Sequence, residues 1–267
     1  MSEKIGFIGV GSQGGPMAHR IVDAGLDLTV WARRPEALEA YVVKGAHAAA
    51  SVADMGASCD HVSICVVTDA DVFQITDQLI PVMRKGSRIA IHSTILPESC
   101  IKLEAQCAAR GIGLIDAPVS GGSPSAEAGT LTVMCGASQA DFAAAKPVFE
   151  TFGRLIVLLG APGAGQRAKI VNNAMLSAHL GIAHHALAAG EALGIDRKAM
   201  AELVSQSSGR SMGFEIYSRM PQPPGPWLGG PLLVKDMKLL QAILPGSPDA
   251  DKLAEAAEGF FAATEPK

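Results

Sequence analysis

Short hydrophobic runs rich in β-branched residues recur at regular intervals along the first 160 residues of the chain. Amphipathic stretches of helix length, such as 16–24 and 97–110, lie between these runs. The strand-like runs are 4–10, 27–31, 61–67, 88–94, 113–119, 130–136 and 154–160. Strands that alternate with helices predict an α/β fold with a Rossmann-type, doubly wound and mostly parallel sheet.

The pattern changes after the glycine-rich segment 160–165. Apolar residues then recur at helical spacing without a convincing strand, which predicts an all-α C-terminal domain. The helical stretches are 168–194, 198–206 and 234–244. The proline and glycine residues of 219–231 exclude a helix there, and we expect this segment to be a surface loop. The predicted boundaries are a first domain over 1–161 and a second over 165–267.

The composition indicates a globular protein with a sizeable core, because 48% of the 267 residues are hydrophobic. The formal net charge is -4. No apolar run approaches the roughly 18 residues of a membrane span, and the first strand-like run leaves no room for a signal peptide. These features favour a cytoplasmic protein with no membrane partner. With no basic cluster to bind nucleic acid, we expect a small-molecule partner instead.

The five cysteines are odd in number and include no C-x-x-C pair, which argues against a disulfide framework and against a zinc site. His184 and His185 are adjacent, so on a helix they point in different directions and cannot jointly bind a metal. His92 lies in a predicted strand with no paired carboxylate in view, and we interpret it as a core residue. We therefore predict no metal site.

The first strand runs into "GVGSQGGPMA", in which Gly9, Gly11 and Gly14 form G-x-G-x-x-G before a helix. Such glycines permit a tight turn and a close approach of the backbone to a pyrophosphate, which then sits at the helix N-terminus. The motif alone is weak, but its place after the first strand of an alternating pattern predicts dinucleotide binding. Ser12 and Gln13, inside the same loop, are predicted cofactor contacts.

The second strand ends in "WARRPE", where an NAD site usually offers a carboxylate to the ribose 2′-hydroxyl. Asp27 lies before that strand and is a poor candidate. Arg33 and Arg34 can instead pair with a 2′-phosphate, so the sequence favours NADP(H) over NAD(H). The alternative is that both arginines are solvated residues of a loop.

The turn "DAPVSGG" follows another strand, and its Ser120, Gly121 and Gly122 leave backbone amides and a hydroxyl uncovered. Ligands of open α/β sheets bind along the carboxyl edge, so this turn suits a substrate carboxylate. Taken alone, such a turn is more often an ordinary strand-to-loop turn.

The stretch "AKIVNNAML" places a lysine and two asparagines within a largely apolar helix. Lys169 and Asn173 are four residues apart and so share one helix face. The helix follows the glycine-rich segment, so its first turns are expected to face the cleft between the domains, where sites tend to form. The alternative reading makes Lys169 an ordinary solvated lysine. Since the long helix is apolar nearly all round, we also expect a homodimer or homotetramer.

Together, "GFIGVGSQGGPMA", "DAPVSGG", "AKIVNN" and "KDM" resemble the β-hydroxyacid dehydrogenases, a family that includes 3-hydroxyisobutyrate dehydrogenases and tartronate semialdehyde reductases. The resemblance implies hydride transfer between NAD(P) and a small carboxylate-bearing hydroxy acid. It also implies site residues with distinct roles. They are Lys169 as acid/base, Asn173 as its neighbour at the substrate, Ser120, Gly121 and Gly122 as the carboxylate cradle, Lys235 near substrate and nicotinamide, and Thr94, Val66, Val67 and Thr68 at the cofactor.

The chain departs from the family pattern at Gln13, where methionine is common, and at Ala32, where asparagine often precedes the arginine. We also expect the chain to lack part of the family's usual C-terminal segment. Two other functions remain open: an imine reductase on the same scaffold, and a non-catalytic dinucleotide-binding module. Lys169 argues against the first of these, because imine reductases of this scaffold usually lack the lysine.

Overall fold

The computed structural model describes residues 3–222, 224–225, 227 and 229–264. The chain divides into two compact units, Met1–Lys169 and Ile170–Lys267. The first unit is an α/β domain with a mostly parallel sheet. In the described part of the second unit, the regular elements are all helices. The predicted fold class is therefore confirmed, while the boundaries at residues 161 and 165 stay predictions.

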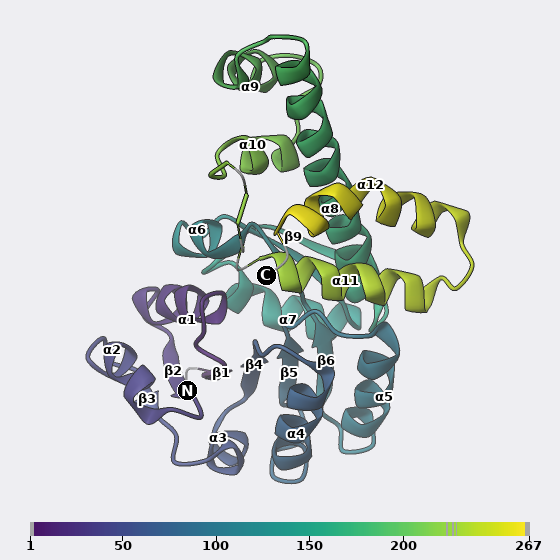
Figure 1. The fold of residues 1–267 in the computed structure, drawn as a ribbon. Coiled ribbons are helices and arrows are strands. Elements are labelled where there is room, and N and C mark those ends of the chain that lie inside the picture. The colour runs from purple at the N-terminus through teal and green to yellow at the C-terminus, as the bar shows by residue number, and fades with distance from the viewer. Residues whose placement is uncertain (1–2, 223, 226, 228, 265–267) are drawn as a thin grey trace. The chain divides into compact units, whose positions relative to one another are not determined.

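One sheet holds the nine strands found in the described part of the first unit. They are β1 (Lys4–Ile8), β2 (Asp27–Trp31), β3 (His47–Ala48), β4 (His61–Ile64), β5 (Arg88–Ile91), β6 (Gly113–Asp116), β7 (Val119–Ser120), β8 (Leu131–Gly136) and β9 (Gly153–Gly160). The spatial order is β3-β2-β1-β4-β5-β6-β8-β7, and β9 pairs with β8 (Figure 1). The sequence analysis missed only β3 and β7, because two-residue strands leave no periodic pattern.

Strands β1 to β6 pair in parallel, whereas β8 runs antiparallel to both β6 and β7. The carboxyl ends of β1, β4, β5 and β6 therefore meet at the same edge of the sheet. In open α/β sheets this edge is where ligands bind.

Helices cover both faces of the sheet and bury a separate hydrophobic cluster on each face. They are α1 (Gly14–Asp23), the short 3-10 helix Pro35–Leu38, α2 (Glu39–Val42), α3 (Val52–Ser58), α4 (Asp69–Leu79), α5 (Pro97–Ala108), α6 (Gly122–Glu127) and α7 (Gln139–Phe149). Successive residues of a strand point to opposite faces, so Phe7 packs in the cluster with Met17 of α1, and Ile8 in the cluster with Val72 of α4.

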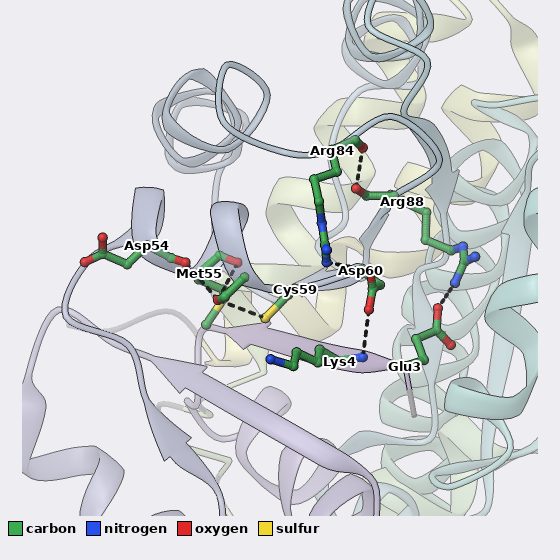
Figure 2. A network of polar contacts seen from close by, with 10 residues as sticks. Glu3, Lys4, Asp54, Met55, Cys59, Asp60, Arg84 and Arg88 are labelled. Atoms are coloured by element: carbon green, nitrogen blue, oxygen red, sulfur yellow. Dashed lines mark hydrogen bonds and ion pairs between the residues drawn. The ribbon is translucent and has the colours of Figure 1, made fainter. Parts of the chain in front are cut away.

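A polar network ties the amino ends of the strands together, at the edge opposite the carboxyl ends (Figure 2). The Asp60 carboxylate accepts a hydrogen bond from the Lys4 backbone N–H at 3.1 Å and pairs with Arg84 at 2.7 Å. Arg88, at the start of β5, pairs with Glu3 (Figure 2). These contacts fix the sheet without occupying its carboxyl edge.

The long helix α8 (Ala164–Ala192) begins in the first unit and continues into the second. The other helices of the second unit are α9 (Arg197–Ser205), α10 (Met212–Ser218), α11 (Gly230–Ile243) and α12 (Pro248–Thr264). Gly181 lets α8 approach α12 closely, since a Cβ there would lie 1.9 Å from the Ala256 carbonyl oxygen. None of the helices in the described residues has the length and apolar character needed to cross a membrane.

Helix boundaries differ slightly from those expected. Helix α1 begins at Gly14 rather than at residue 16, and Gly165, expected in the joint between domains, already belongs to α8. In the expected loop 219–231, Gly230 and Pro231 start α11, because proline is well tolerated in the first helical turn. Residues 223, 226 and 228 of that loop lie outside the described residues.

Candidate active site

The glycine-rich loop after β1 leads directly into the N-terminus of α1. No side chain in the described residues caps this N-terminus, and its first turn contains no acidic residue. The first N–H groups of a helix lack intrahelical partners and carry a partial positive charge. An anionic group such as a pyrophosphate therefore fits here, because it supplies the missing acceptors.

The three glycines of the loop serve different purposes. Gly9 has a φ of 95°, and a Cβ there would lie 2.1 Å from the Cys65 carbonyl oxygen. A Cβ at Gly14 would lie 2.1 Å from the Gly9 carbonyl oxygen. Protein packing thus explains Gly9 and Gly14. A Cβ at Gly11 meets no protein atom within 4 Å, so open space lies where a ligand can approach the backbone.

A pocket of about 280 Å³ adjoins this loop at the carboxyl edge of the sheet. Several residues singled out from the sequence line it, namely Gly9, Gly11, Arg33, Arg34, Val66 and Val67. Ser12, Gln13, Gly14, Thr68 and Thr94 belong to the same unit but are not among its lining residues. The pocket has an apolar wall from Ile8, Trp31 and Ile75, which suits an adenine ring.

Asp71 also lines this pocket and was missed by the sequence analysis. Its Oδ1 lies 3.7 Å from a guanidinium nitrogen of Arg33, whose side chain is 77% exposed. A carboxylate thus stands beside the arginine that was expected to pair with a 2′-phosphate. No local pattern indicated this contact, because Asp71 comes from α4 and is 38 residues away from Arg33 along the chain.

Thr68 is the N-cap of α4 and forms a capping box with Asp71. The Thr68 hydroxyl accepts from the Asp71 backbone N–H at 3.1 Å and donates to Asp71 Oδ2 at 2.7 Å. The capping box uses Oδ2 of Asp71, whereas Oδ1 faces Arg33. The position of the carboxylate in the pocket is therefore held by the start of α4.

The turn after β7 places Gly121 and Gly122 at φ values of 131° and 69°, which only glycine adopts readily. Ser120, half-buried, ends β7 opposite Thr132. The hydroxyl of the next serine, Ser123, donates to the Ser12 carbonyl oxygen at 2.7 Å. The structure thus brings the "SGGS" turn and the glycine-rich loop side by side, although they are more than 100 residues apart in the sequence.

Asp116, the last residue of β6, is a fully buried carboxylate that caps the start of α8. Its two oxygens accept from the backbone N–H groups of Gly163 at 2.7 Å and Gln166 at 2.8 Å. Burial raises the pKa of Asp116 to about 6, and these backbone hydrogen bonds limit the rise. Lys169, half-buried, follows on the next turn of α8.

In the second unit, Asn173 is held by a buried carboxylate that the sequence analysis did not single out. The Asn173 Nδ2 donates to Asp236 Oδ2 at 2.6 Å, and the Asn173 Oδ1 accepts from Asn172 at 3.1 Å. The ammonium group of Lys235 lies 3.2 Å from Asp236 Oδ1. Asp236 thus links Asn173 of α8 with Lys235 of α11, two residues implicated by the family resemblance. The "KDM" motif contained the signal for Asp236.

The histidines lie apart from these groups, whereas Cys65 lines the pocket beside the glycine-rich loop. His92 is buried as predicted, and one Ser63 hydroxyl bridges its Nε2 at 3.1 Å to Nε2 of His61 at 3.0 Å. Burial lowers the pKa of His61 to about 3 and that of His92 to about 4. His184 contacts the Tyr217 hydroxyl at 2.7 Å. Among the described residues, no cluster of three His, Cys, Asp or Glu side chains could hold a metal ion.

Comparison with known protein families covers both units. Residues 4–160 match the family described as the NAD binding domain of 6-phosphogluconate dehydrogenase. Residues 163–265 match the family described as the NAD-binding of NADP-dependent 3-hydroxyisobutyrate dehydrogenase. Together the two matches span nearly the whole chain, in the order of the two predicted domains.

Individual relatives agree with these matches. The chain is 37% identical over 222 residues to an NAD-dependent L-serine dehydrogenase of Pseudomonas aeruginosa, covering 82% of this chain and 74% of that protein. It is 34% identical over 273 residues to a 3-hydroxyisobutyrate dehydrogenase of the same organism, covering 96% and 90%. Among solved structures, a Mycobacterium tuberculosis 3-hydroxyisobutyrate dehydrogenase with L-serine matches with a TM-score of 0.86 and 26% identity, covering 100% of this chain and 97% of that one.

Proposed function

This chain belongs to the β-hydroxyacid dehydrogenase family of NAD(P)-dependent enzymes that act on CH–OH groups, and we propose that Lys169 is its catalytic acid/base. The reaction oxidises a small β-hydroxy acid to its semialdehyde or β-keto acid, or runs in reverse. The observation that carries this proposal is the motif "AKIVNN" on α8, where Lys169 and Asn173 lie one helical turn apart.

In the oxidative direction, the neutral amine of Lys169 takes the proton of the substrate hydroxyl as the C–O bond becomes a carbonyl. A bound oxidised nicotinamide would supply the acceptor for the hydrogen and electron pair of the C–H bond, which leave together as hydride. In the reductive direction, the ammonium form of Lys169 returns the proton to the carbonyl oxygen. Asn173 supports this step from the next turn, and Asp236 keeps the Asn173 amide in one orientation through a 2.6 Å hydrogen bond.

We propose that the substrate carboxylate binds to the Ser120–Gly122 turn and to Lys235. Ser120 offers a hydroxyl, and the positive φ values of Gly121 and Gly122 turn the backbone so that amide groups are uncovered. The relatives named for L-serine and 3-hydroxyisobutyrate act on acids that carry a hydroxyl on the β-carbon. A carboxylate two carbons from the reacting hydroxyl is therefore the feature that we expect this enzyme to recognise.

For the cofactor, we propose that the glycine-rich loop, with Ser12 and Gln13, holds the pyrophosphate and that NADP(H) is preferred over NAD(H). Arg33 and Arg34 line the pocket beside Gly11, and no carboxylate follows β2 directly. Val66, Val67, Thr68 and Thr94 complete the cofactor side in this proposal. The relatives differ in this respect, since one is named NAD-dependent and one matched family NADP-dependent.

A panel of substrates tests the proposed reaction directly. L-Serine, 3-hydroxyisobutyrate and matched alcohols without the carboxylate are each oxidised with NAD and with NADP. We expect turnover of at least one β-hydroxy acid and none of its alcohol counterpart. Ser120→Ala should raise KM for the acid more than KM for the cofactor. Equal turnover of the acid and the alcohol would contradict the proposed carboxylate site.

A further inference from the structure

Gln166 lies in the first turn of α8, and its side chain is fully buried within the first unit. The carboxamide makes two hydrogen bonds to one loop, the segment that follows β5. Its Oε1 accepts from the Ile95 backbone N–H at 3.1 Å, and its Nε2 donates to the Ser93 carbonyl oxygen at 2.9 Å. A carboxamide can both donate and accept through two polar atoms that lie in one plane.

The two partners of Gln166 flank Thr94, the residue proposed to line the cofactor side of the site. Gln166 therefore holds the backbone on both sides of Thr94. The same loop is tied to the end of β4, because the Ser93 hydroxyl accepts from the Val66 backbone N–H at 2.8 Å. Val66 lines the dinucleotide pocket, so the clamp extends to the pocket wall.

The backbone of Gln166 is fixed as firmly as its side chain. Its N–H donates to Asp116 Oδ2, while Gly163 donates to Asp116 Oδ1, so both oxygens of a buried carboxylate hold the start of α8. These buried bonds join the ends of β5 and β6 to one helical turn. Buried polar networks in which every partner is satisfied are rigid and specify one arrangement.

We propose that Gln166 is a positioning residue that fixes the Thr94 loop relative to Lys169, three residues further along α8. This inference rests on the proposed function, in which Lys169 moves the proton and Thr94 lines the cofactor side. Loss of the clamp lets the loop drift relative to the lysine, and displacements of about 1 Å in a reacting geometry lower rates by about 100-fold. Gln166 itself touches neither substrate nor cofactor in this scheme.

The test compares Gln166→Met with Thr76→Val. Methionine fills the space of glutamine without its hydrogen bonds. Thr76 is equally buried in α4, and its hydroxyl donates to the Val72 carbonyl oxygen at 2.9 Å, so Thr76→Val removes a buried hydrogen bond away from the clamp. We measure melting temperature, kcat, both KM values and the deuterium isotope effect with substrate labelled at the reacting carbon.

We expect Gln166→Met to lower kcat about tenfold to 100-fold and to raise the isotope effect on kcat, because hydride transfer becomes the slow step. The KM for the cofactor should change by less than about threefold, and Thr76→Val should keep the kcat of the unmodified enzyme. A Gln166→Met enzyme with kcat within about twofold of the unmodified enzyme would overturn the inference. An equal loss of kcat in Thr76→Val would overturn it too.

If Gln166→Met does not fold, Gln166→Asn decides the question. Asparagine keeps the carboxamide but is one methylene shorter, so it cannot reach both the Ile95 N–H and the Ser93 carbonyl oxygen, and we expect a loss of kcat at unchanged cofactor KM. Unchanged kcat in Gln166→Asn would refute the clamp. The proposed function fails separately, if Lys169→Ala retains turnover, whereas an essential Lys169 with a dispensable Gln166 refutes only the inference about Gln166.

Discussion

At the level of single residues, the pair Arg33 and Asp71 bears most directly on the choice between NADP(H) and NAD(H). Their charged groups are 3.7 Å apart in a pocket that both residues line. An exposed ion pair of this kind contributes little to stability, about 0 to 1 kcal/mol. A charged ligand can therefore break it at little cost. A 2′-phosphate would draw Arg33 away from Asp71, and the Asp71 carboxylate would repel that phosphate.

Asp71→Asn should therefore increase the preference for NADP(H). Asparagine keeps an oxygen for the capping box with Thr68 while the negative charge is lost, so we expect NADPH to bind about threefold to tenfold more tightly. NADH affinity should stay nearly unchanged. Arg33→Ala should act in the opposite direction and weaken NADPH specifically. Fluorescence titration of both cofactors measures the four affinities, and equal effects on NADH and NADPH would refute a role for either charge at the 2′-position.

The residues that the sequence analysis missed have partners far away along the chain. In the sequence, Asp71 has the pattern of a helix-capping residue, Gln166 is a polar residue just after the glycine-rich segment, and Asp236 is the neighbour of a lysine. The partner of each is 38 or more residues away, at Arg33, at Ser93 and Ile95, and at Asn173. Local patterns show which residue types are present, but tertiary contacts decide what those residues touch.

At the level of helices and strands, the alternation of strand-like and helix-like segments in the sequence predicted most of the fold. Parallel strands buried on both faces form continuous apolar runs, as β1, β4, β5 and β6 do. The strands β2, β8 and β9 also left clear apolar runs in the sequence, although β9 is largely exposed. The two-residue strands β3 and β7 left none. The order of β8 between β6 and β9 could not be predicted either, because strand order depends on packing between helices and sheet.

The loop between β1 and α1 allows binding and folding to be separated by two matched substitutions. A Cβ at Gly11 meets no protein atom within 4 Å, whereas a Cβ at Gly14 would lie 2.1 Å from the Gly9 carbonyl oxygen. We expect Gly11→Ala to keep the melting temperature and to weaken NADPH binding about tenfold or more. Gly14→Ala should lower the free energy of unfolding by about 1 to 3 kcal/mol.

Thermal unfolding and cofactor titration of both variants measure this separation. A Gly11→Ala protein that binds NADPH as tightly as the unmodified protein would show that the dinucleotide does not approach this backbone.

At the scale of the whole molecule, three buried groups govern the dependence of stability on pH. The folded-state pKa values of His61 and His92, about 3 and about 4, lie below the ordinary value of 6.5. As the pH falls below 6.5, these two imidazoles are protonated in the unfolded state but remain neutral in the folded state. Each of them therefore lowers the free energy of unfolding by about 1.4 kcal/mol for every unit by which the pH falls. Asp116 acts oppositely between about pH 4 and 6, because its pKa is raised to about 6.

We expect the free energy of unfolding to fall by about 1 to 2 kcal/mol per pH unit between pH 6 and pH 4.5, after the opposing effect of Asp116 is included. His92→Phe should remove about 1.4 kcal/mol per pH unit from this slope, whatever its effect on absolute stability. His47→Gln is the control, because the His47 side chain is 72% exposed. Urea unfolding at several pH values gives the slopes, and an unchanged slope in His92→Phe would contradict the assignment.

The oligomeric state also belongs to this scale. Val171, Met175 and Ile182 of α8 are 50%, 54% and 55% exposed within the single chain, an unusual amount of apolar surface on one helix. We propose that α8 takes part in a homodimer or homotetramer. Light scattering at micromolar concentration should show at least a dimer, and Ile182→Asp should shift it toward the monomer. A monomeric unmodified protein would refute this proposal.

The rate of hydride transfer in Lys169→Ala is the most direct measurement of whether Lys169 moves the proton of the reacting hydroxyl. The enzyme is mixed rapidly with a β-hydroxy acid that it oxidises and with its preferred cofactor, and nicotinamide reduction is followed in a single turnover. We expect the rate to fall about 100-fold or more, because general acid–base catalysis contributes on that scale.

Cofactor affinity should stay within about threefold of the unmodified enzyme. Lys169→Arg should be as slow as Lys169→Ala, because guanidinium does not release its proton near neutral pH. Lys198→Ala, at an exposed lysine of α9, should leave the rate unchanged. A Lys169→Ala enzyme that retains more than about a tenth of the original rate would contradict the assignment of Lys169 as the acid/base.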